Sequence, residues 1–370
     1  MPANRTRQAQ IPDQATANDD IAGGFAHFAL PVTPPFSPME ARSAGSVPKG
    51  PGYQFEPKWD GFRCLAFRDG KHVALQSKAG KPLDRYFPEI VQALLDLKAA
   101  RFVLDGELVI PVGDHLSFDD LLMRIHPASS RVKKLAQETP AVLVLFDILV
   151  NDRNVSLTGA PLEKRRIELE QFFAKYGATR GRLRLSPRTR SVTEARQWSE
   201  TRAGLDGIIA KLLDRPYESG ERTGAVLKIK KLRTAECVVG GFRYASRGRE
   251  IGSLLLGLYD QDKLLNHVGF TSSLHQGERR MLTGRLEKLI KPPGFTGATP
   301  GGPSRWSTER SAQWEPLAPK LVVEVQYDHF SGGRFRHGTK FLRWRPDKAP
   351  EQCSMRQVES ESHTPLPKFD

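Results

Sequence analysis

The first residue that could do chemistry is Lys58, in the stretch Glu56-Pro57-Lys58-Trp59-Asp60-Gly61-Phe62-Arg63. A lysine amine attacks a phosphate only when it is neutral, and near pH 7.5 only about one ordinary lysine in a thousand is neutral. Nearby positive charge lowers the pKa of the amine, and Arg63, a divalent metal on substrate phosphates or converging lysines could each supply it. Asp60-Gly61 adds a carboxylate and a tight turn. Taken alone, the stretch is equally well explained by a solvent-facing lysine between two strands.

Five further stretches carry residue types that suit phosphate, metal or base binding. They are Ser77-Lys78-Ala79-Gly80-Lys81, Asp105-Gly106-Glu107, Phe146, Asp206-Gly207-Ile208-Ile209-Ala210-Lys211 and Lys228-Ile229-Lys230. Singly, each is better explained without a function, because acidic pairs at strand ends and alternating lysines usually face solvent, and a phenylalanine among apolar neighbours is usually core. Their coincidence with Lys58 in this order favours a functional interpretation of the whole set.

Together these stretches resemble the motif series of the covalent nucleotidyltransferases, the family of ATP-dependent DNA ligases, RNA ligases and mRNA capping enzymes. Lys58-x-Asp60-Gly61-x-Arg63 is similar to the first motif, and the resemblance covers roughly residues 34 to 359. It is closest to bacterial ATP-dependent ligase C and to the ligase domain of bacterial ligase D. It implies that Lys58 attacks the α-phosphate of ATP, expels pyrophosphate and carries AMP. The AMP would then pass to the 5′-phosphate at a nick, where the 3′-hydroxyl displaces it.

The resemblance also implies roles for individual residues. Glu56 would help to seat the adenine and Phe146 would stack on it, while Lys228 and Lys230 would contact the α-phosphate. Mg²⁺ or Mn²⁺ would bind Glu107 and Asp206. The whole nucleotide-binding set is Glu56, Asp60, Arg63, Lys78, Glu107, Phe146, Lys211, Arg222, Lys228 and Lys230.

A sixth stretch, Arg343-Trp344-Arg345-Pro346-Asp347-Lys348, is similar to a motif that the family carries on a mobile domain. Its Arg345, Asp347 and Lys348 would orient the leaving pyrophosphate, where charge develops in the transition state. The basic loop at 330–340 precedes it, and we interpret this loop as contacting the nucleic-acid backbone.

Two positions depart from the family pattern. Lys78 stands where the family usually has arginine, so a point charge replaces a planar fork that could bind in a bidentate manner. Asp206 stands where the family usually has a metal-binding glutamate, and its side chain is one methylene shorter. The sequence does not say what either departure does to the activity.

The charge balance favours a polyanionic partner, because 56 Lys and Arg residues face 42 Asp and Glu residues and leave a net charge of +14. Nicked double-stranded DNA is the expected partner, and the sequence leaves open whether Ku or another repair protein recruits the chain. Three widely spaced cysteines argue for a reducing compartment and against a disulfide framework or a zinc site. No apolar run approaches eighteen residues, so we expect neither a membrane span nor export. A cytoplasmic bacterial monomer, nucleoid-associated when bound to DNA, is expected.

Alternation and turn signals predict the elements that position these residues. Lys58 is expected in a loop that leads into a hairpin. Strands are predicted at 62–68, 73–77, 101–112, 141–149, 205–212 and 225–231, with helices at 87–100, 161–176 and 193–202. Short strands at 237–244, 253–260, 267–272 and 321–327 with one helix at 277–290 then fit a small oligonucleotide-binding barrel.

The expected fold class is therefore α+β, with a nucleotidyltransferase domain of mixed sheets and helices, an ATP-grasp-like adenylation domain, followed by an OB-fold β-barrel. The predicted parts are a disordered N-terminal arm at 1–33, the nucleotidyltransferase domain at 34–232, the OB-fold domain at 235–350 and a C-terminal tail at 351–370. The expected activity is ATP-dependent DNA ligation in DNA repair. An RNA ligase or capping-type nucleotidyltransferase remains an alternative within the superfamily. A non-catalytic nucleic-acid-binding OB protein remains one from another class.

Overall fold

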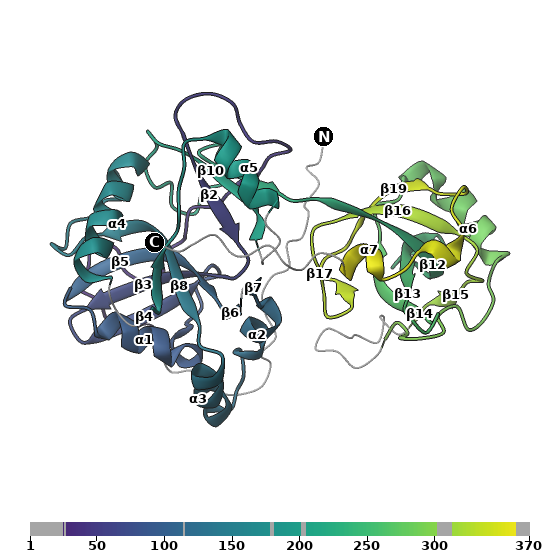
Figure 1. Ribbon diagram of the computed structural model, residues 1–370, viewed down its shortest axis with the longest axis horizontal. Coiled ribbons are helices and arrows are strands. Elements are labelled where there is room, and N and C mark those ends of the chain that lie inside the picture. The colour runs from purple at the N-terminus through teal and green to yellow at the C-terminus, as the bar shows by residue number, and fades with distance from the viewer. Residues whose placement is uncertain are drawn as a thin grey trace. The chain divides into compact units, whose positions relative to one another are not determined.

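The computed structural model describes residues 25, 27–113, 115–177, 181–200, 205–301 and 313–359. The side chains of residues 199, 200 and 359 are outside this description, as are the predicted arm up to residue 24 and the predicted tail from residue 360. The described residues form two compact units, of which the first ends at Lys230 and the second begins at Lys231 (Figure 1). The α+β fold class is confirmed, since each unit combines sheets with helices.

Two sheets form the framework of the first unit. The first sheet has the strand order β1-β11-β10-β2, with β1 parallel to β11 and the other pairs antiparallel. The second sheet has the order β4-β3-β5-β8-β9, in which only the β8–β9 pair is parallel. The strands are β1 (Arg42–Ser43), β2 (Tyr53–Trp59), β3 (Phe62–Asp69), β4 (His72–Ser77), β5 (Arg101–Val109), β8 (Val142–Val150), β9 (Leu183–Leu185), β10 (Leu205–Leu212) and β11 (Val226–Lys230), with a separate pair β6 (Pro111–Val112) and β7 (His115–Leu116).

Helices cover the apolar faces of these sheets. The largest core of the unit joins the second sheet to α1 and α4, through buried residues such as Phe102, Ile90 and Leu169. A smaller core lies between the first sheet and α5, with Phe55, Ile208 and Ala195 in contact. The helices of the unit are η1 (Asp84–Tyr86), α1 (Pro88–Leu95), α2 (Phe118–Met123), α3 (Ser129–Glu138), α4 (Leu162–Tyr176) and α5 (Val192–Glu200).

Helix α1 begins where the sequence predicted but ends at Leu95 rather than near residue 100. The guanidinium group of Arg68 donates hydrogen bonds to the carbonyl groups of Leu94 and Leu97, the latter over 2.7 Å. These bonds satisfy carbonyl groups at the helix end that another helical turn would otherwise have satisfied. The chain can therefore leave the helix early and enter β5.

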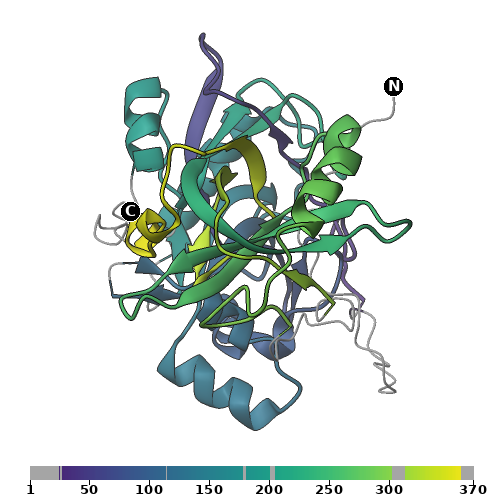
Figure 2. The ribbon, with the colours of Figure 1, turned by 90° about the vertical axis from the view of Figure 1, so that its right-hand side faces the viewer.

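The second unit is built on antiparallel strands in the order β14-β13-β12-β16-β19, with β15 also paired to β12. Thr271 in β14 forms a bridge with Thr339, the residue before β19, which joins the two edges of the sheet and closes it into a barrel (Figure 2). Its elements are β12 (Arg233–Tyr244), β13 (Ile251–Tyr259), β14 (Leu265–Thr271), η2 (Gln276–Glu278), α6 (Arg279–Glu287), β15 (Glu315–Pro316), β16 (Val322–Tyr327), β17 (Phe330–Ser331), β18 (Arg334–Phe335), β19 (Lys340–Trp344), η4 (Pro350–Gln352) and α7 (Arg356–Glu359).

Two predicted boundaries need correction. Residues 27–33 were assigned to the disordered arm, but Phe28, Leu30 and Val32 are buried in a core with Phe67 of the second sheet, because these alternating apolar residues cover an apolar face of that sheet. The described part of the predicted tail, 351–359, likewise belongs to the second unit, where Cys353 and Val358 are buried.

All three cysteines of the chain are free thiols and are fully buried. Cys64 lies in the core of the first unit, whereas Cys237 and Cys353 lie in the core of the second. Within the described residues, none of the helices combines the length and apolarity needed to cross a membrane.

Candidate active site

Strand alternation places the polar residues of the first sheet on one face. Along β2, Gln54, Glu56 and Lys58 alternate with Phe55, which packs into the core under α5. Along β11, Lys228 and Lys230 alternate with residues of the same core. Because successive side chains of a strand point to opposite faces, burying the apolar set presents the polar set together.

Lys58 lies within β2 and not in a loop, which corrects the sequence-based expectation. Pro57 is compatible with this strand because β2 is an edge strand of its sheet, where a proline costs no ladder hydrogen bond on the open side. Pairing with β10 continues to Trp59, opposite Leu205, past a bulge at that end of β10. Lys58 is therefore held by a sheet rather than by a turn.

Asp60-Gly61 carries the chain from the first sheet to the second. A Cβ atom on Gly61 would lie 2.1 Å from the carbonyl oxygen of Leu108 in β5, so only glycine allows this close approach. The next strand, β3, then presents Arg63 beside Glu107, its register partner in β5. The glycine thus brings the residues of the two sheets together.

Lys58 forms an ion pair with Asp206 of β10, with 2.6 Å between Nζ and Oδ2. Burial disfavours the charged lysine, but Asp206, followed by Asp60 and Glu107, more than offsets this effect and raises the pKa of Lys58. The sequence-based expectation that nearby cations lower the pKa of Lys58 is therefore wrong for this state. The charges that act most strongly on the amine are carboxylates, so Lys58 is held as an ammonium group.

The carboxylates around Lys58 suit a divalent cation. Carboxylate oxygens of Asp60 and Asp206 lie within 4.8 Å of each other. Burial raises the pKa of Glu107 to about 7, with Asp60 and Asp105 adding to the rise against the opposing effects of Arg63 and Lys58. Hard cations such as Mg²⁺ and Mn²⁺ prefer oxygen ligands of this kind. The residues present therefore fit the metal that the sequence implied.

Phe146 occupies a bulge in β8. Asp105 pairs with Asp147 and Gly106 with Leu145, so Phe146 is the extra residue between them. Its ring centroid lies 4.5 Å from the guanidinium carbon of Arg63 and 4.5 Å from the Nζ atom of Lys211. An adenine ring stacked on Phe146 would share the ring with these cations or displace one of them.

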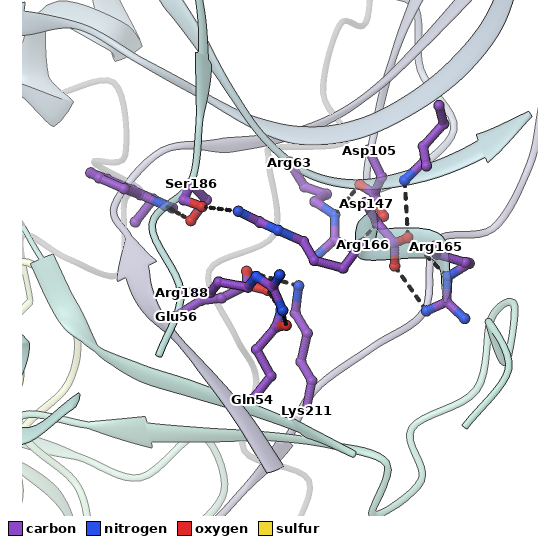
Figure 3. Close-up of polar contacts among 12 residues, drawn as sticks. Gln54, Glu56, Arg63, Asp105, Asp147, Arg165, Arg166, Ser186, Arg188 and Lys211 are labelled. Carbon is purple, nitrogen blue, oxygen red and sulfur yellow. Dashed lines mark hydrogen bonds and ion pairs between the residues drawn. The ribbon is translucent and has the colours of Figure 1, made fainter. Parts of the chain in front are cut away.

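A series of hydrogen-bonded polar side chains holds Lys211 in place. Its Nζ atom lies 2.8 Å from Oε2 of Glu56, whose other oxygen accepts a hydrogen bond from Gln54 over 2.8 Å (Figure 3). Arg188 in turn donates to Gln54 over 3.2 Å and is paired with Glu170. Glu56, predicted to seat the adenine, therefore also fixes the cation beside Phe146.

A second group of cations gathers around Lys228. Burial, and then repulsion from Lys58, Lys230, Lys78 and Arg222, lowers the pKa of Lys228 to about 8. Lys78 and Arg222 both pair with Glu40, at 3.2 Å from Lys78 Nζ and 2.9 Å from Arg222 Nε to the same carboxylate oxygen. Four other cations of the predicted site therefore act electrostatically on Lys228, and such a concentration of positive charge suits the binding of an anion.

In the second unit, Arg345, Asp347 and Lys348 form a cluster of their own. Arg345 binds Asp347, with 2.8 Å between Nη2 and Oδ2, and its Nη1 atom binds Glu236 of β12. Lys348 binds the same Glu236 over 2.8 Å. Gln357 of α7 holds the backbone of Glu236 through hydrogen bonds of 2.9 and 2.8 Å. A segment assigned to the tail therefore supports the predicted pyrophosphate-orienting motif.

Comparison of the sequence with models of known protein families shows to which family the chain belongs. A model described as the ATP dependent DNA ligase domain matches residues 38–230, and one described as the ATP dependent DNA ligase C terminal region matches residues 247–348. The chain belongs to the ATP-dependent DNA ligase family. The first match ends at residue 230, just before the second structural unit begins at Lys231.

Individual ligases resemble the chain over nearly their whole length. DNA ligase C2 of Mycolicibacterium smegmatis is 42% identical over 352 residues, covering 90% of this chain and 97% of the relative. DNA ligase C of Mycobacterium tuberculosis is 42% identical over 346 residues, covering 89% and 95%. A solved Lig E DNA ligase structure matches with a TM-score of 0.53 and 18% identity over 84% of this chain and 99% of that one, a likeness of fold.

Three residues of this ligase site were missed as functional residues. Asp105, fully buried, pairs with both Nε and Nη2 of Arg63 over 2.6 Å. Tyr217 donates a hydrogen bond to Asp105, and Glu40 bridges Lys78 and Arg222. Asp105 lies two residues before Glu107 in the same motif, so the alternation of a strand is a signal that could have placed the two on one face. Tyr217 and Glu40 had no local signal.

Proposed function

We propose that this ligase seals nicks in duplex DNA through a lysyl-AMP intermediate on Lys58. The observation that carries the proposal is the Lys58–Asp206 pair, because it sets a half-buried amine between a group of carboxylates and a group of cations. The carboxylates suit a metal, and the cations suit phosphates. A nucleophile between them is in a position to attack a metal-bound phosphate.

Each of the chain's own residues has a task in this proposal. Phe146, with Lys211 and Glu56 behind it, seats the adenine. Lys228 and Lys230 hold the α-phosphate, while Lys78 and Arg222 stand at the edge of the same cation group. A divalent cation bound by Asp60, Glu107 and Asp206 would supply positive charge at the α-phosphate. Lys58 must give up its proton before its amine can attack.

Arg345, Asp347 and Lys348 are proposed to orient the pyrophosphate as it leaves. The bidentate Arg345–Asp347 pair and Glu236 hold the two cations of this motif in one cluster. Grouped cations of this kind stabilise charge that develops on a leaving group. They have no target once AMP is attached to the enzyme.

For the DNA step, the net charge of +14 supports a nicked duplex as substrate, held largely through its phosphates. We propose a DNA repair role as a monomer in the bacterial cytoplasm, associated with the nucleoid when bound to DNA, since the DNA ligase relatives come from bacteria. Recruitment by Ku or another repair protein is a further proposal, and a pull-down with purified Ku tests it.

The decisive experiment is incubation with α-labelled ATP and Mg²⁺. Wild-type protein should become labelled, whereas Lys58→Ala and Lys58→Arg should not, the second because its guanidinium group stays charged. Lys71→Ala is the matched control, since Lys71 is an exposed lysine of the same unit. Labelling of both Lys58 variants at the wild-type level would overturn the mechanism.

The substrate class is tested in two assays. The labelled enzyme should seal nicked duplex DNA faster than it seals nicked duplexes or ends made of RNA. In the labelling step itself, ATP should be used in preference to GTP. Binding to nicked DNA should weaken about 10³- to 10⁵-fold between roughly 50 and 200 mM salt if six to ten phosphates are contacted. A flat salt dependence would mean that phosphate contacts are not the main grip on DNA.

A further inference from the structure

The Tyr217 hydroxyl group connects two parts of the first unit that are far apart in the sequence. It accepts a hydrogen bond from the backbone N–H of Met39 over 3.1 Å and donates one to Oδ2 of Asp105 over 2.6 Å. Tyr217 is buried, and burial, followed by the charge of Asp105, raises the pKa of its hydroxyl group well above the ordinary value. The hydroxyl group therefore remains a proton donor to Asp105.

Asp105, which Tyr217 holds, in turn fixes the orientation of Arg63. Its two oxygens accept from Nε and Nη2 of Arg63 over 2.6 Å each, so the plane of the guanidinium group is fixed by the carboxylate (Figure 3). The guanidinium carbon of Arg63 lies 4.5 Å from the ring centroid of Phe146. A rotation of the Asp105 carboxylate would therefore move the cation beside the proposed adenine platform.

The ring of Tyr217 is itself held in place. Phe36 stacks on it with ring centroids 6.2 Å apart, and the guanidinium carbon of Arg165 lies 5.5 Å from its centroid. Arg165 forms a bidentate pair with Asp147, which is the register partner of Asp105 across β5 and β8 (Figure 3). With its ring fixed in this way, the hydroxyl group can act as a rigid support for Asp105.

We propose that Tyr217 is a positioning residue of the adenylylation site, which orients Arg63 beside Phe146 by holding Asp105. The proposal deepens the proposed function and rests on it. It also gives a task to the chain that precedes β1, because Phe36 and Met39 hold Tyr217. If Tyr217 were only a core residue, removing its oxygen would lower stability without changing how the enzyme uses ATP.

Tyr217→Phe tests this, because it removes the hydroxyl group and keeps the ring. Tyr176→Phe is the matched control, since the hydroxyl group of Tyr176 also donates to an aspartate, Asp152, over 2.8 Å in the same unit. The rate of label uptake is measured against ATP concentration, together with the melting temperature. For Tyr217→Phe we expect the half-saturating ATP concentration to rise about tenfold, as for the loss of one charge-assisted hydrogen bond. Its maximal rate should change less than threefold, and Tyr176→Phe should leave both values at the wild-type level.

A double-mutant cycle with Arg63→Lys shows whether Tyr217 acts through Arg63. Adding Tyr217→Phe to Arg63→Lys should raise the half-saturating ATP concentration far less than tenfold, because the group that Tyr217 positions is already altered. The control change should combine with Arg63→Lys without coupling. Multiplicative effects of Tyr217→Phe and Arg63→Lys would overturn the proposal. A Tyr217→Phe protein that matches wild type in its ATP dependence would also overturn it. The same holds if Tyr217→Phe takes up less label only because it is unfolded, as its circular-dichroism spectrum would show. Absence of label in wild-type protein would instead overturn the proposed function itself.

Discussion

Asp206 holds Lys58 as an ammonium group, with 2.6 Å between the two charged atoms across the neighbouring strands β10 and β2. The pair stabilises the charged form of the proposed nucleophile, which is the unreactive form. The same carboxylate is a proposed metal ligand. Asp206 would therefore exchange one positive partner for another, so that Lys58 is released only when the metal is present.

The first prediction concerns this exchange. Asp206→Asn should raise the Mg²⁺ concentration needed for adenylylation by about 10- to 100-fold, because a charged ligand is lost. Asp206→Glu keeps the charge and should stay within about tenfold of wild type in the same titration. Asp214→Asn, at an exposed aspartate of the same unit, is the control.

The opposite result would be equally informative. Asn at position 206 also removes the strongest charge that raises the pKa of Lys58. If Asp206→Asn takes up label faster than wild type at every Mg²⁺ concentration, Asp206 only restrains the lysine and does not bind the metal.

The second prediction separates the work of the two units. Asp347→Ala or Lys348→Ala should slow self-adenylylation at least about a hundredfold, since their cluster would act on the leaving pyrophosphate. Closure of a nick supplied already adenylated should fall much less. Lys228→Ala should impair both reactions, because Lys228 would face the α-phosphate throughout. The two rates are measured for each variant, and equal losses for the Asp347 and Lys348 variants would mean that the cluster holds DNA or the barrel fold.

The third prediction is a pH dependence of stability in the barrel. Burial, and then repulsion from Arg334 and Arg243, lowers the pKa of His267 to about 3, against about 6.5 in the unfolded chain. Between these two pKa values, His267 is therefore protonated in the unfolded chain but neutral in the folded protein. The stabilising effect of the neutral ring is fully present above about pH 6.5 and is lost as the pH falls towards 3, at up to about 1.4 kcal/mol per pH unit.

Urea unfolding at pH 7.5 and 5.0 measures this effect. Between these two values wild type should lose about 2 kcal/mol more stability than His267→Gln, which cannot titrate. His275→Gln changes an exposed histidine of the same unit and should behave as wild type. Parallel losses in wild type and His267→Gln would show that His267 is not the acid-sensitive group.

The fourth prediction tests the close approach at Gly61. A Cβ atom there would lie 2.1 Å from the carbonyl oxygen of Leu108, so Gly61→Ala should cost about 1–3 kcal/mol and lower the melting temperature by several degrees. Label uptake should fall as well, because Asp60 would shift. Gly159→Ala, with no atom within 4 Å of its Cβ position, should change neither value. If Gly61→Ala is as stable as the control, β5 can move away from residue 61, and the close approach does not require glycine.

Local patterns were enough to predict much of the framework. Alternation identified β3, and strand-like runs, one of them continuously apolar, identified β8, β10 and β11. The alternating lysines of β11, Lys228 and Lys230, were already expected on one face. It failed at Lys58, which was placed in a loop before the predicted hairpin but lies within β2. A proline is compatible with a strand at the edge of a sheet, but strand order is a tertiary property that no local pattern reports.

The supporting contacts of the site could not be predicted for the same reason. Tyr217 and Asp105 are 112 positions apart, and Glu40 and Arg222 are 182 apart. Each pair is set by how separate segments fold onto one another. The expectation of a lowered Lys58 pKa failed because the sequence shows which charges exist but not which ones come closest.

The buried thiols make the chain suitable for site-specific chemistry. Cys64, Cys237 and Cys353 account for every cysteine and are fully buried, so maleimide dyes should not react with the native protein. A cysteine introduced at an exposed position such as Lys71 in the first unit, and another at Met281 in the second, would be the accessible thiols of the variant. A donor and an acceptor dye at these two positions would report the distance between the units by energy transfer. Any change in this distance could then be followed in solution as ATP, pyrophosphate and nicked DNA are added in turn.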